Sequence, residues 1–338
     1  MSTTTTTQTM PAWRQRRYGE ADAVTLVSVP VPTPGRGQAL VRLRATGLNN
    51  GDVRVMRGEP LLVRLAFGVR RPRQPVRGMD AAATVVALGD GVAGIAVGDE
   101  VVGELPGGGL ARFALAPAER LVPRPGGVDA VLAASLPVAA GTAWQALEKA
   151  RIASAGEAPA RVLVIGASGG VGTFAVQLAA QRGAEVWALC GERNRALVES
   201  LGAARTFDYR RVQPGDPELA DGAFDAVLDI AGTAPLRVLR RLVRDGGRVV
   251  LVSGEGGRVL GPIGRLLRAA LLSIGSKRPL VPLAATPKPD VLAELLALTA
   301  AGGLHPVIAR TAPFADAGDA LAEVAGGHVT GKIVVLAG

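Results

Sequence analysis

Three glycines at three-residue intervals form the sharpest chemical signal in the chain. Gly166, Gly169 and Gly172 lie between an apolar run, residues 161–165, and a helix expected over residues 172–182. Missing side chains let a backbone turn tightly and approach a phosphate, and the amides and dipole at the start of a helix attract an anion. A flexible glycine-rich turn is the alternative, but the flanking strand and helix favour a dinucleotide pyrophosphate site.

The whole loop is therefore assigned to cofactor binding. Ser168 adds a hydroxyl donor, and the loop lacks the Gly-Lys-Ser/Thr ending of a phosphoryl-transfer loop. The predicted cofactor-binding residues of this loop are Gly166, Ala167, Ser168, Gly169, Gly170, Val171 and Gly172.

The residues after the second strand bear on which dinucleotide is bound. An NAD site usually has an acidic residue at the end of that strand, but the strand expected over residues 185–189 has none at its tip, and Glu192 comes slightly later. Arg193 and Asn194 follow it, and an arginine can pair with a 2′-phosphate. We predict NADPH, with Arg193 and Asn194 in its site; a solvated charge cluster at a helix start is the alternative.

Two patterns of secondary structure must position these groups. The first third of the chain contains short strands, expected over residues 39–45, 80–88 and 99–103 and separated by Gly/Pro turns, which indicate a small, partly open barrel. From residue 161 onward, apolar strands alternate with helices, which indicates a parallel sheet covered on both faces. The expected elements are strands over 161–165, 185–189, 224–230, 248–252, 308–310 and 332–336, and helices over 133–149 (interrupted by Pro137 and Gly141), 172–182, 195–201 and 315–325.

Composition narrows the class of protein. A chain of 338 residues suits two domains. Its single cysteine, Cys190, excludes a disulfide within the chain and an all-cysteine zinc site, and a cytoplasmic location is the default expectation. The net charge is +9, but aromatic residues make up only 3% and no nucleic-acid-binding motif is present, so no nucleic-acid partner is expected.

The N-terminus and the apolar runs carry no targeting or spanning signal. Residues 1–9 are polar and lack the apolar core of a signal peptide, so we expect a disordered leader. No apolar run reaches the roughly 18 residues that a membrane span needs.

The order of motifs resembles a known family over nearly the whole chain. The motifs are LPVAAGTAWQAL (136–147), VLVIGASGGVGTFAVQLA (162–179), FDAVLDIAG (224–232), DGGRVVLVSG (245–254) and GHVTGKIVV (327–335). Together they resemble the medium-chain dehydrogenase/reductase superfamily in its quinone oxidoreductase branch. The resemblance implies an α/β chain: a GroES-like, partly open β-barrel catalytic domain over residues 10–131 and 304–338, and a Rossmann doubly wound parallel-sheet domain over 132–303 that binds NADP. It also implies an active site in the cleft between them and a homodimer.

The chain departs from the zinc branch of that superfamily. The zinc branch carries Gly-x-Cys-x-x-Asp and Gly-His-Glu motifs, which match residues 47–52 and 78–80 here. Asn49 stands at the position of the cysteine and Met79 at that of the histidine. Zinc prefers thiolate, imidazole and carboxylate ligands, and the two histidines of the chain, His305 and His328, lie far along the chain from these motifs. We therefore predict no metal.

Hydride transfer to an activated carbon is the chemistry that suits such a chain. We expect NADPH-dependent reduction of a small quinone or α,β-unsaturated carbonyl. The resemblance assigns catalytic positions to Asn49, which would orient the nicotinamide or donate to an oxyanion, and to Thr142. Turn capping and a helix-start role are the alternatives for these two. Lys332 would reach the cofactor phosphates or be a strand-edge lysine, and Asp52 and Asp80 are expected to pair with arginines.

Two basic segments and two other functions stay open. Residues 64–77 are expected to form a long loop near the cleft mouth. Residues 257–277 contain an amphipathic basic stretch. It is either a helix that packs on the Rossmann domain or at a dimer interface, or a segment that attaches peripherally to an anionic membrane. The alternative functions are a zinc-independent alcohol or aldehyde oxidoreductase and a dinucleotide-binding protein with little catalysis.

Overall fold

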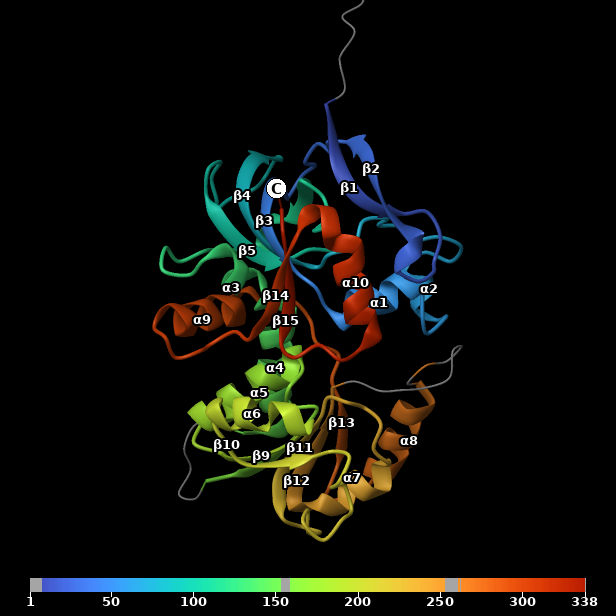
Figure 1. The fold of residues 1–338 in the computed structure, drawn as a ribbon, viewed down its shortest axis with the longest axis vertical. Coiled ribbons are helices and arrows are strands. Elements are labelled where there is room, and N and C mark those ends of the chain that lie inside the picture. The colour runs from blue at the N-terminus through green and yellow to red at the C-terminus, as the bar shows by residue number, and fades with distance from the viewer. Residues whose placement is uncertain (1–7, 153–158, 253–260, 262, 338) are drawn as a thin grey trace, which may run out of the picture.

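Two large β-sheets, each with its own helices, occupy opposite ends of the molecule (Figure 1). The computed structural model describes residues 8–152, 159–252, 261 and 263–337. The upper sheet in Figure 1 contains strands from both ends of the chain, and the lower sheet is built from the middle of the chain. The chain therefore leaves the upper unit once, builds the lower one and returns.

The lower unit is a six-stranded sheet in which every neighbouring pair is parallel. The strand order β10-β9-β8-β11-β12-β13 is the doubly wound order of a Rossmann fold. This confirms the predicted parallel sheet. Its strands are β8 (Arg161–Ile165), β9 (Glu185–Cys190), β10 (Ala203–Asp208), β11 (Phe224–Asp229), β12 (Val243–Leu251) and β13 (Leu280–Pro282).

Helices cover both faces of this sheet, because alternate side chains of each strand point to opposite sides. In β8, Val162 and Val164 belong to one apolar core, which includes Phe174 of α5, whereas Leu163 belongs to a second core with Leu239 of α7. The helices of this part of the chain are α4 (Pro137–Ala150), α5 (Gly170–Gln181), α6 (Arg195–Ser200), α7 (Leu236–Leu242), α8 (Ile263–Ser273) and α9 (Pro289–Ala300). A strand buried on both faces has to be apolar throughout, which is why β8 could be predicted from the sequence.

The upper unit is a mostly antiparallel sheet in the order β14-β15-β3-β4-β5-β7, with β6 also paired to β3. Strand β15 from the C-terminus pairs with β3, so the last strands complete the N-terminal sheet as a GroES-like domain requires. The elements are β1 (Thr9–Gln15), β2 (Val24–Pro30), β3 (Gln38–Gly47), β4 (Asp80–Leu88), β5 (Glu100–Glu104), β6 (Phe113–Pro117), β7 (Leu121–Pro123), β14 (Ile308–Pro313), β15 (Lys332–Leu336), α1 (Asn50–Arg57), α2 (Val63–Phe67), α3 (Ala130–Ala134) and α10 (Ala317–Gly326). The residue boundaries of the two domains stay a prediction.

Three local expectations were wrong. The leader does not extend to residue 9, because Thr9 pairs with Pro30 where β1 begins; residues 1–7 lie outside the described residues. The helical segment expected over 133–149 does break before Pro137, where α3 ends at Ala134 and Pro137 starts α4 with a missing amide that costs nothing, but α4 continues through Gly141, which was expected to interrupt it. The predicted long loop over 64–77 contains the end of α2.

Candidate active site

The glycine loop connects β8 to α5, and two of its glycines are required for steric reasons. Gly166 has φ +89°, a conformation that favours glycine. A Cβ on Gly172 would lie 2.2 Å from the carbonyl oxygen of Gly166, so helix and loop could not pack as closely with any other residue. Helix α5 begins at Gly170, and its first amides have no intrahelical partner. The loop is therefore built to present free amides at the carboxyl end of β8.

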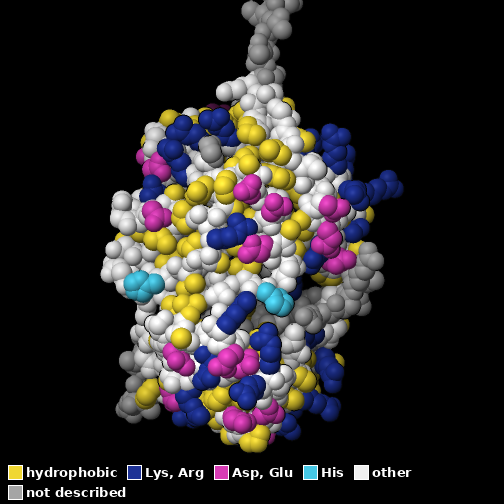
Figure 2. Space-filling model, viewed as in Figure 1, with side chains coloured by type: hydrophobic (Ala, Val, Ile, Leu, Met, Phe, Trp, Pro, Cys, Tyr) yellow, Lys and Arg dark blue, Asp and Glu magenta, His cyan; other side chains and the backbone are white. Residues whose placement is uncertain are grey.

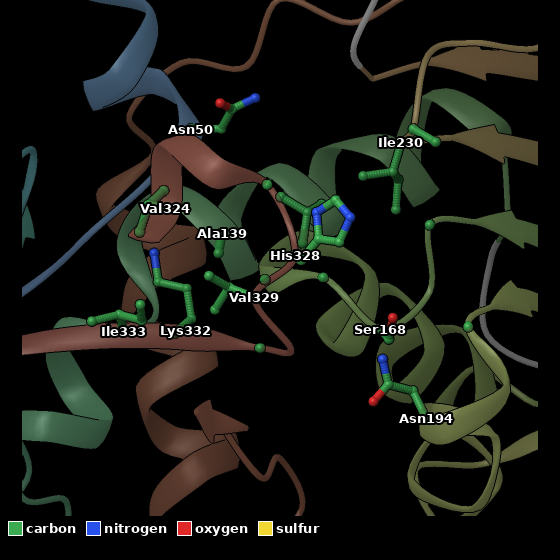
Figure 3. A pocket seen from close by; sticks show the side chains of 18 of the residues that line it. Asn50, Ala139, Ser168, Asn194, Ile230, Val324, His328, Val329, Lys332 and Ile333 are labelled. Atoms are coloured by element: carbon green, nitrogen blue, oxygen red, sulfur yellow. The ribbon is translucent and has the colours of Figure 1, made fainter. Parts of the chain in front are cut away.

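A pocket of about 580 Å³ opens in front of this loop, between the two sheets. It contains the ends of β8 and β11, where the order of a doubly wound sheet reverses and ligands bind. Both domains line it (Figure 3). The lining residues are Leu48, Asn49, Asn50, Ala139, Gly166, Ser168, Gly169, Gly170, Val171, Gly191, Arg193, Asn194, Tyr209, Arg210, Ile230, Ala231, Val324, Ala325, Gly327, His328, Val329, Gly331, Lys332 and Ile333.

Most of the predicted cofactor-binding residues meet in this pocket. The exceptions are Ala167, which is fully buried, and Gly172, whose place is behind the loop. The predicted catalytic residues separate: Asn49 lines the pocket, whereas Thr142 is not among its lining residues. Helix α4 contributes Ala139 instead, about one turn earlier.

The tip of β9 gathers basic side chains around a glycine. Gly191, Arg193, Tyr209 and Arg210 all line the pocket there. Arg210 lies near enough to Gly191 that a Cβ on that glycine would be 3.5 Å from its guanidinium. Glu192 turns away and pairs with Arg195 at 3.3 Å.

Sequence reasoning missed Tyr209 and Arg210. They follow β10, the strand next to β9, so the order of strands brings them to the same sheet edge. An aromatic and a basic residue directly after the third strand were the available signal.

A short loop from the C-terminal region is bonded across the cleft to the glycine loop. The amide of Gly331 donates to the carbonyl of Ser168 at 2.9 Å. Thr330 Oγ1 donates to Asn194 Oδ1 at 3.1 Å, and Arg193 Nη2 donates to the carbonyl of His328 at 3.0 Å. We call residues 328–331, with these three hydrogen bonds, the 328–331 strip. It fixes the catalytic domain against the dinucleotide loop on one side of the pocket.

Asn49, Asp80 and Lys332 form a buried polar triad at the catalytic-domain end of the pocket. Lys332 Nζ donates to Asn49 Oδ1 at 2.5 Å and to Asp80 Oδ2 at 3.1 Å, and Asn49 Nδ2 donates to Asp80 Oδ2 at 2.8 Å. The Lys332 and Asp80 side chains are only 3% and 0% exposed. Since an ammonium only donates and a carboxylate accepts, this arrangement fixes the orientation of the Asn49 amide.

The triad differs from what the sequence predicted for its members. Lys332 directs its ammonium to Asn49 and Asp80, on the side of the pocket away from Ser168 and Asn194 (Figure 3). The expectation that Asp80 pairs with an arginine was wrong, because its cation is Lys332. Asp80 also accepts from the amide of Val138, so it fixes the start of α4 against β4.

Two further carboxyl groups are buried beside the triad. Asp52 accepts from the backbone amides of Asn49 and Gly78 rather than from an arginine side chain, and burial together with the nearby Asp80 raises the pKa of Asp52 to about 6. Glu104 pairs with Asp80 in the β4–β5 register, and burial together with Asp80 raises the pKa of Glu104 to about 7. Three carboxyl groups thus lie close together behind the Lys332 ammonium, and Arg77 and Arg120 are further cations near them.

Comparison with known proteins identifies the family. A model of the alcohol dehydrogenase GroES-like domain matches residues 35–126, and one described as a zinc-binding dehydrogenase matches residues 201–335. The chloroplast envelope quinone oxidoreductase homolog of Arabidopsis thaliana is 37% identical over 305 residues, 88% of this chain and 89% of that protein. The chain belongs to the medium-chain dehydrogenase/reductase superfamily, in its quinone oxidoreductase-like branch. This confirms the resemblance found in the sequence.

Other members of the superfamily match over almost the full length. The mitochondrial NAD(P)H oxidoreductase RTN4IP1 of Mus musculus is 30% identical over 370 residues, covering 99% of this chain and 91% of that protein. The solved structure of the quinone oxidoreductase from Coxiella burnetii superposes with a TM-score of 0.84 at 26% identity, covering 97% of this chain and 99% of that one. No helix in the described part of the chain is long and apolar enough to cross a membrane.

Proposed function

We propose that this protein transfers hydride from NADPH to a quinone or an α,β-unsaturated carbonyl compound, without a zinc ion. One observation carries the proposal: a single pocket joins the dinucleotide loop of one domain to the Asn49–Asp80–Lys332 triad of the other. Membership of the family supports an oxidoreductase with a nicotinamide cofactor. The choice of NADPH and of the acceptor is our proposal.

The residues of the pocket fit a dinucleotide phosphate. The glycine loop leaves space in front of Gly169, where a Cβ atom would meet only the carbonyl oxygen of Gly166, at 3.6 Å. Gly170 and Val171, in the first turn of α5, would hold the pyrophosphate through their amides. Arg193 and Arg210 at the tip of β9 would hold a 2′-phosphate, which favours NADPH over NADH.

The triad supports a reaction without zinc because of its donor chemistry. Asn49 and Met79 stand where the zinc branch has its cysteine and histidine, and neither is a zinc ligand of the usual kind. The buried Asp80 carboxylate already has a cation, the Lys332 ammonium at 3.1 Å. Among the described residues, no group of three or more His, Cys, Asp or Glu side chains is arranged to hold a metal ion.

Lys332 is the group of the triad best placed to stabilise negative charge on a substrate. Both atoms of the Asn49 amide are engaged, by Lys332 and by Asp80. Lys332 lines the pocket and uses two of its three N–H hydrogens for these described partners, which leaves one for a substrate oxygen. A bound nicotinamide supplies the hydride. Conjugated acceptors suit this arrangement because their charge spreads onto an oxygen that Lys332 can bind.

The direct test is an initial-rate survey of the purified, metal-analysed protein. The acceptors are 1,4-benzoquinone, 9,10-phenanthrenequinone, an enone, an alkenal and a simple aldehyde, each with NADPH and with NADH. We expect quinones or enones to be reduced with NADPH preferred, and substoichiometric zinc. About one zinc per chain, or turnover of the aldehyde alone, would contradict the proposal. NADPH binding without turnover of any acceptor would favour a non-catalytic dinucleotide-binding protein. A cytoplasmic location and a homodimer stay predictions.

A further inference from the structure

Exposed apolar side chains gather on two helical segments that belong to different domains. Of the ten large apolar side chains that are exposed in the described part of the chain, six lie there. They are Leu65, Phe67 and Val69 at the end of α2 and just after it, and Leu267, Leu271 and Ile274 on and just after α8. The last three are 62%, 69% and 77% exposed and follow one another along a single helical segment, unlike the scattered single residues that any protein surface contains.

The two segments approach each other where they begin. A Cβ built on Gly261, just before α8, would lie 2.3 Å from Cγ of Pro60, just before α2. Both helices lie on the same side of the molecule, at the right of Figure 1. We call the exposed residues 65–73 and 267–277 together the α2–α8 surface.

Helix α8 is fixed so that its apolar stripe faces outward. Arg265 reaches inward and donates to Asp229 Oδ2 at 2.6 Å and to the carbonyl of Ala234 at 2.7 Å. Ala269 is fully buried in the core beneath the helix. Because Leu267 and Leu271 are four residues apart, they share the opposite face of the helix, and Ile274 continues it. The predicted basic segment 257–277 is therefore a packed helix with an uncovered outer face; residues 257–260 and 262 lie outside the described residues.

The charged residues of the two segments themselves are all basic. Residues 60–79 and 261–289 contain no aspartate or glutamate. Arg70, Arg71 and Arg73 are exposed beside the first segment, and Arg268 and Lys277 beside the second. Figure 2 shows basic side chains along this edge, above and below the grey segment, with acidic side chains between them. Two nearby acidic residues are each engaged in an ion pair: Asp245 with Arg278 at 2.8 Å, and Glu20 with Arg57, also at 2.8 Å.

We propose that the α2–α8 surface docks on an anionic phospholipid bilayer. On such a membrane the protruding leucines would enter the boundary of the acyl chains. The arginines and lysines beside them would contact the layer of lipid phosphates. An apolar patch alone would fit a protein partner equally well. The absence of acidic residues from both segments is what favours a uniformly anionic partner.

Vesicle co-sedimentation of the full-length protein tests this surface. Phosphatidylcholine vesicles with and without phosphatidylglycerol are compared at low and high salt. Binding is expected only with phosphatidylglycerol and is expected to weaken as salt rises, because exposed charges are screened. Arg70→Gln with Arg71→Gln should lower the partition coefficient about 5-fold for each arginine. Leu267→Ser with Leu271→Ser should lower it roughly 10-fold or more.

A matched control separates this surface from general stickiness. Val97 is 63% exposed but lies in the β4–β5 connection, and Val97→Ser should bind vesicles as the wild type does. Far-UV circular dichroism and NADPH binding check that each variant is folded; if the leucine variant unfolds, the arginine variant decides. The proposal is overturned by no binding at low salt, or by binding that the variants leave unchanged. It is also overturned if the leucine variant abolishes self-association in sedimentation velocity while vesicles are never bound, since the face then joins two copies of the chain.

Discussion

Replacing Lys332 by methionine tests the buried triad most sharply. The change keeps an unbranched side chain but removes the ammonium, and Asp80, which is 0% exposed, then has the amides of Val138 and Asn49 as its remaining donors among the described residues. Breaking a buried pair from one side costs about 3–5 kcal/mol, because it leaves an uncompensated charge. At roughly 2–4 °C per kcal/mol, we expect the melting temperature to fall by about 6–20 °C.

An exposed pair of the same type provides the control. Lys288 Nζ lies 3.0 Å from Glu148 Oε2, nearly the distance of the buried pair, but both side chains are more than 40% exposed. Lys288→Met should cost no more than about 1 kcal/mol, since surface ion pairs contribute little. Differential scanning fluorimetry of both variants, with urea unfolding as a second probe, gives the comparison.

A second substitution separates stability from chemistry. Adding Asp80→Asn to Lys332→Met removes the unpaired charge and should recover at least half of the lost stability. Activity should not return, because the donor to the substrate oxygen is still missing. Equal melting temperatures for Lys332→Met and Lys288→Met would refute the argument about burial, and full activity of the double variant would remove Lys332 from the reaction.

Three further predictions follow from the pocket and its surroundings. Arg193→Ala and Arg210→Ala should each lower kcat/KM for NADPH by roughly 10–100-fold more than that for NADH; equal losses with both cofactors would exclude a 2′-phosphate site. Gly172→Ala places a methyl group 2.2 Å from a loop carbonyl and should abolish NADPH binding in a fluorescence titration, whereas Gly141→Ala, with nothing within 4 Å, should bind normally; an unchanged Kd for both would contradict the packing argument. Because the pKa of Glu104 is raised from 4.5 to about 7, its ionisation lowers stability as pH rises through that range. Glu104→Gln should therefore be about 2–3 kcal/mol more stable than wild type above pH 7 and show no such gain near pH 4.5; an advantage that does not change with pH would point to packing instead.

The sequence predicted the dinucleotide half of the site because its signals are local. The strand β8 matched the expected residues 161–165, and the glycine loop follows it directly. Both rest on short-range requirements: a strand covered on both faces is apolar throughout, and a tight turn at positive φ needs glycine. Strands such as β10 were missed, since it is an edge strand whose sequence, AARTFD, carries charged residues.

The catalytic half could not be derived in the same way. Lys332 and Asn49 are 283 residues apart and meet only because β15 returns to pair with β3. No spacing in the sequence indicates that the terminal lysine binds an asparagine and an aspartate of the first domain. Thr142 was assigned a catalytic position from the family resemblance. Its helix, α4, does reach the pocket, but the residue of that helix that lines the pocket is Ala139.

The 328–331 strip determines how the two domains can move. Its three hydrogen bonds join the loop before β15 to the glycine loop and to the residues after β9. At a net value of about 1 kcal/mol each, they oppose separation of the two domains on this side of the cleft. An opening motion that preserves these hydrogen bonds is a rotation of one domain relative to the other about an axis through the strip. Asn50 and Ile230 line the pocket away from Ser168 and Asn194 in Figure 3, so such a rotation would separate them. We expect substrate and product to exchange through that opening.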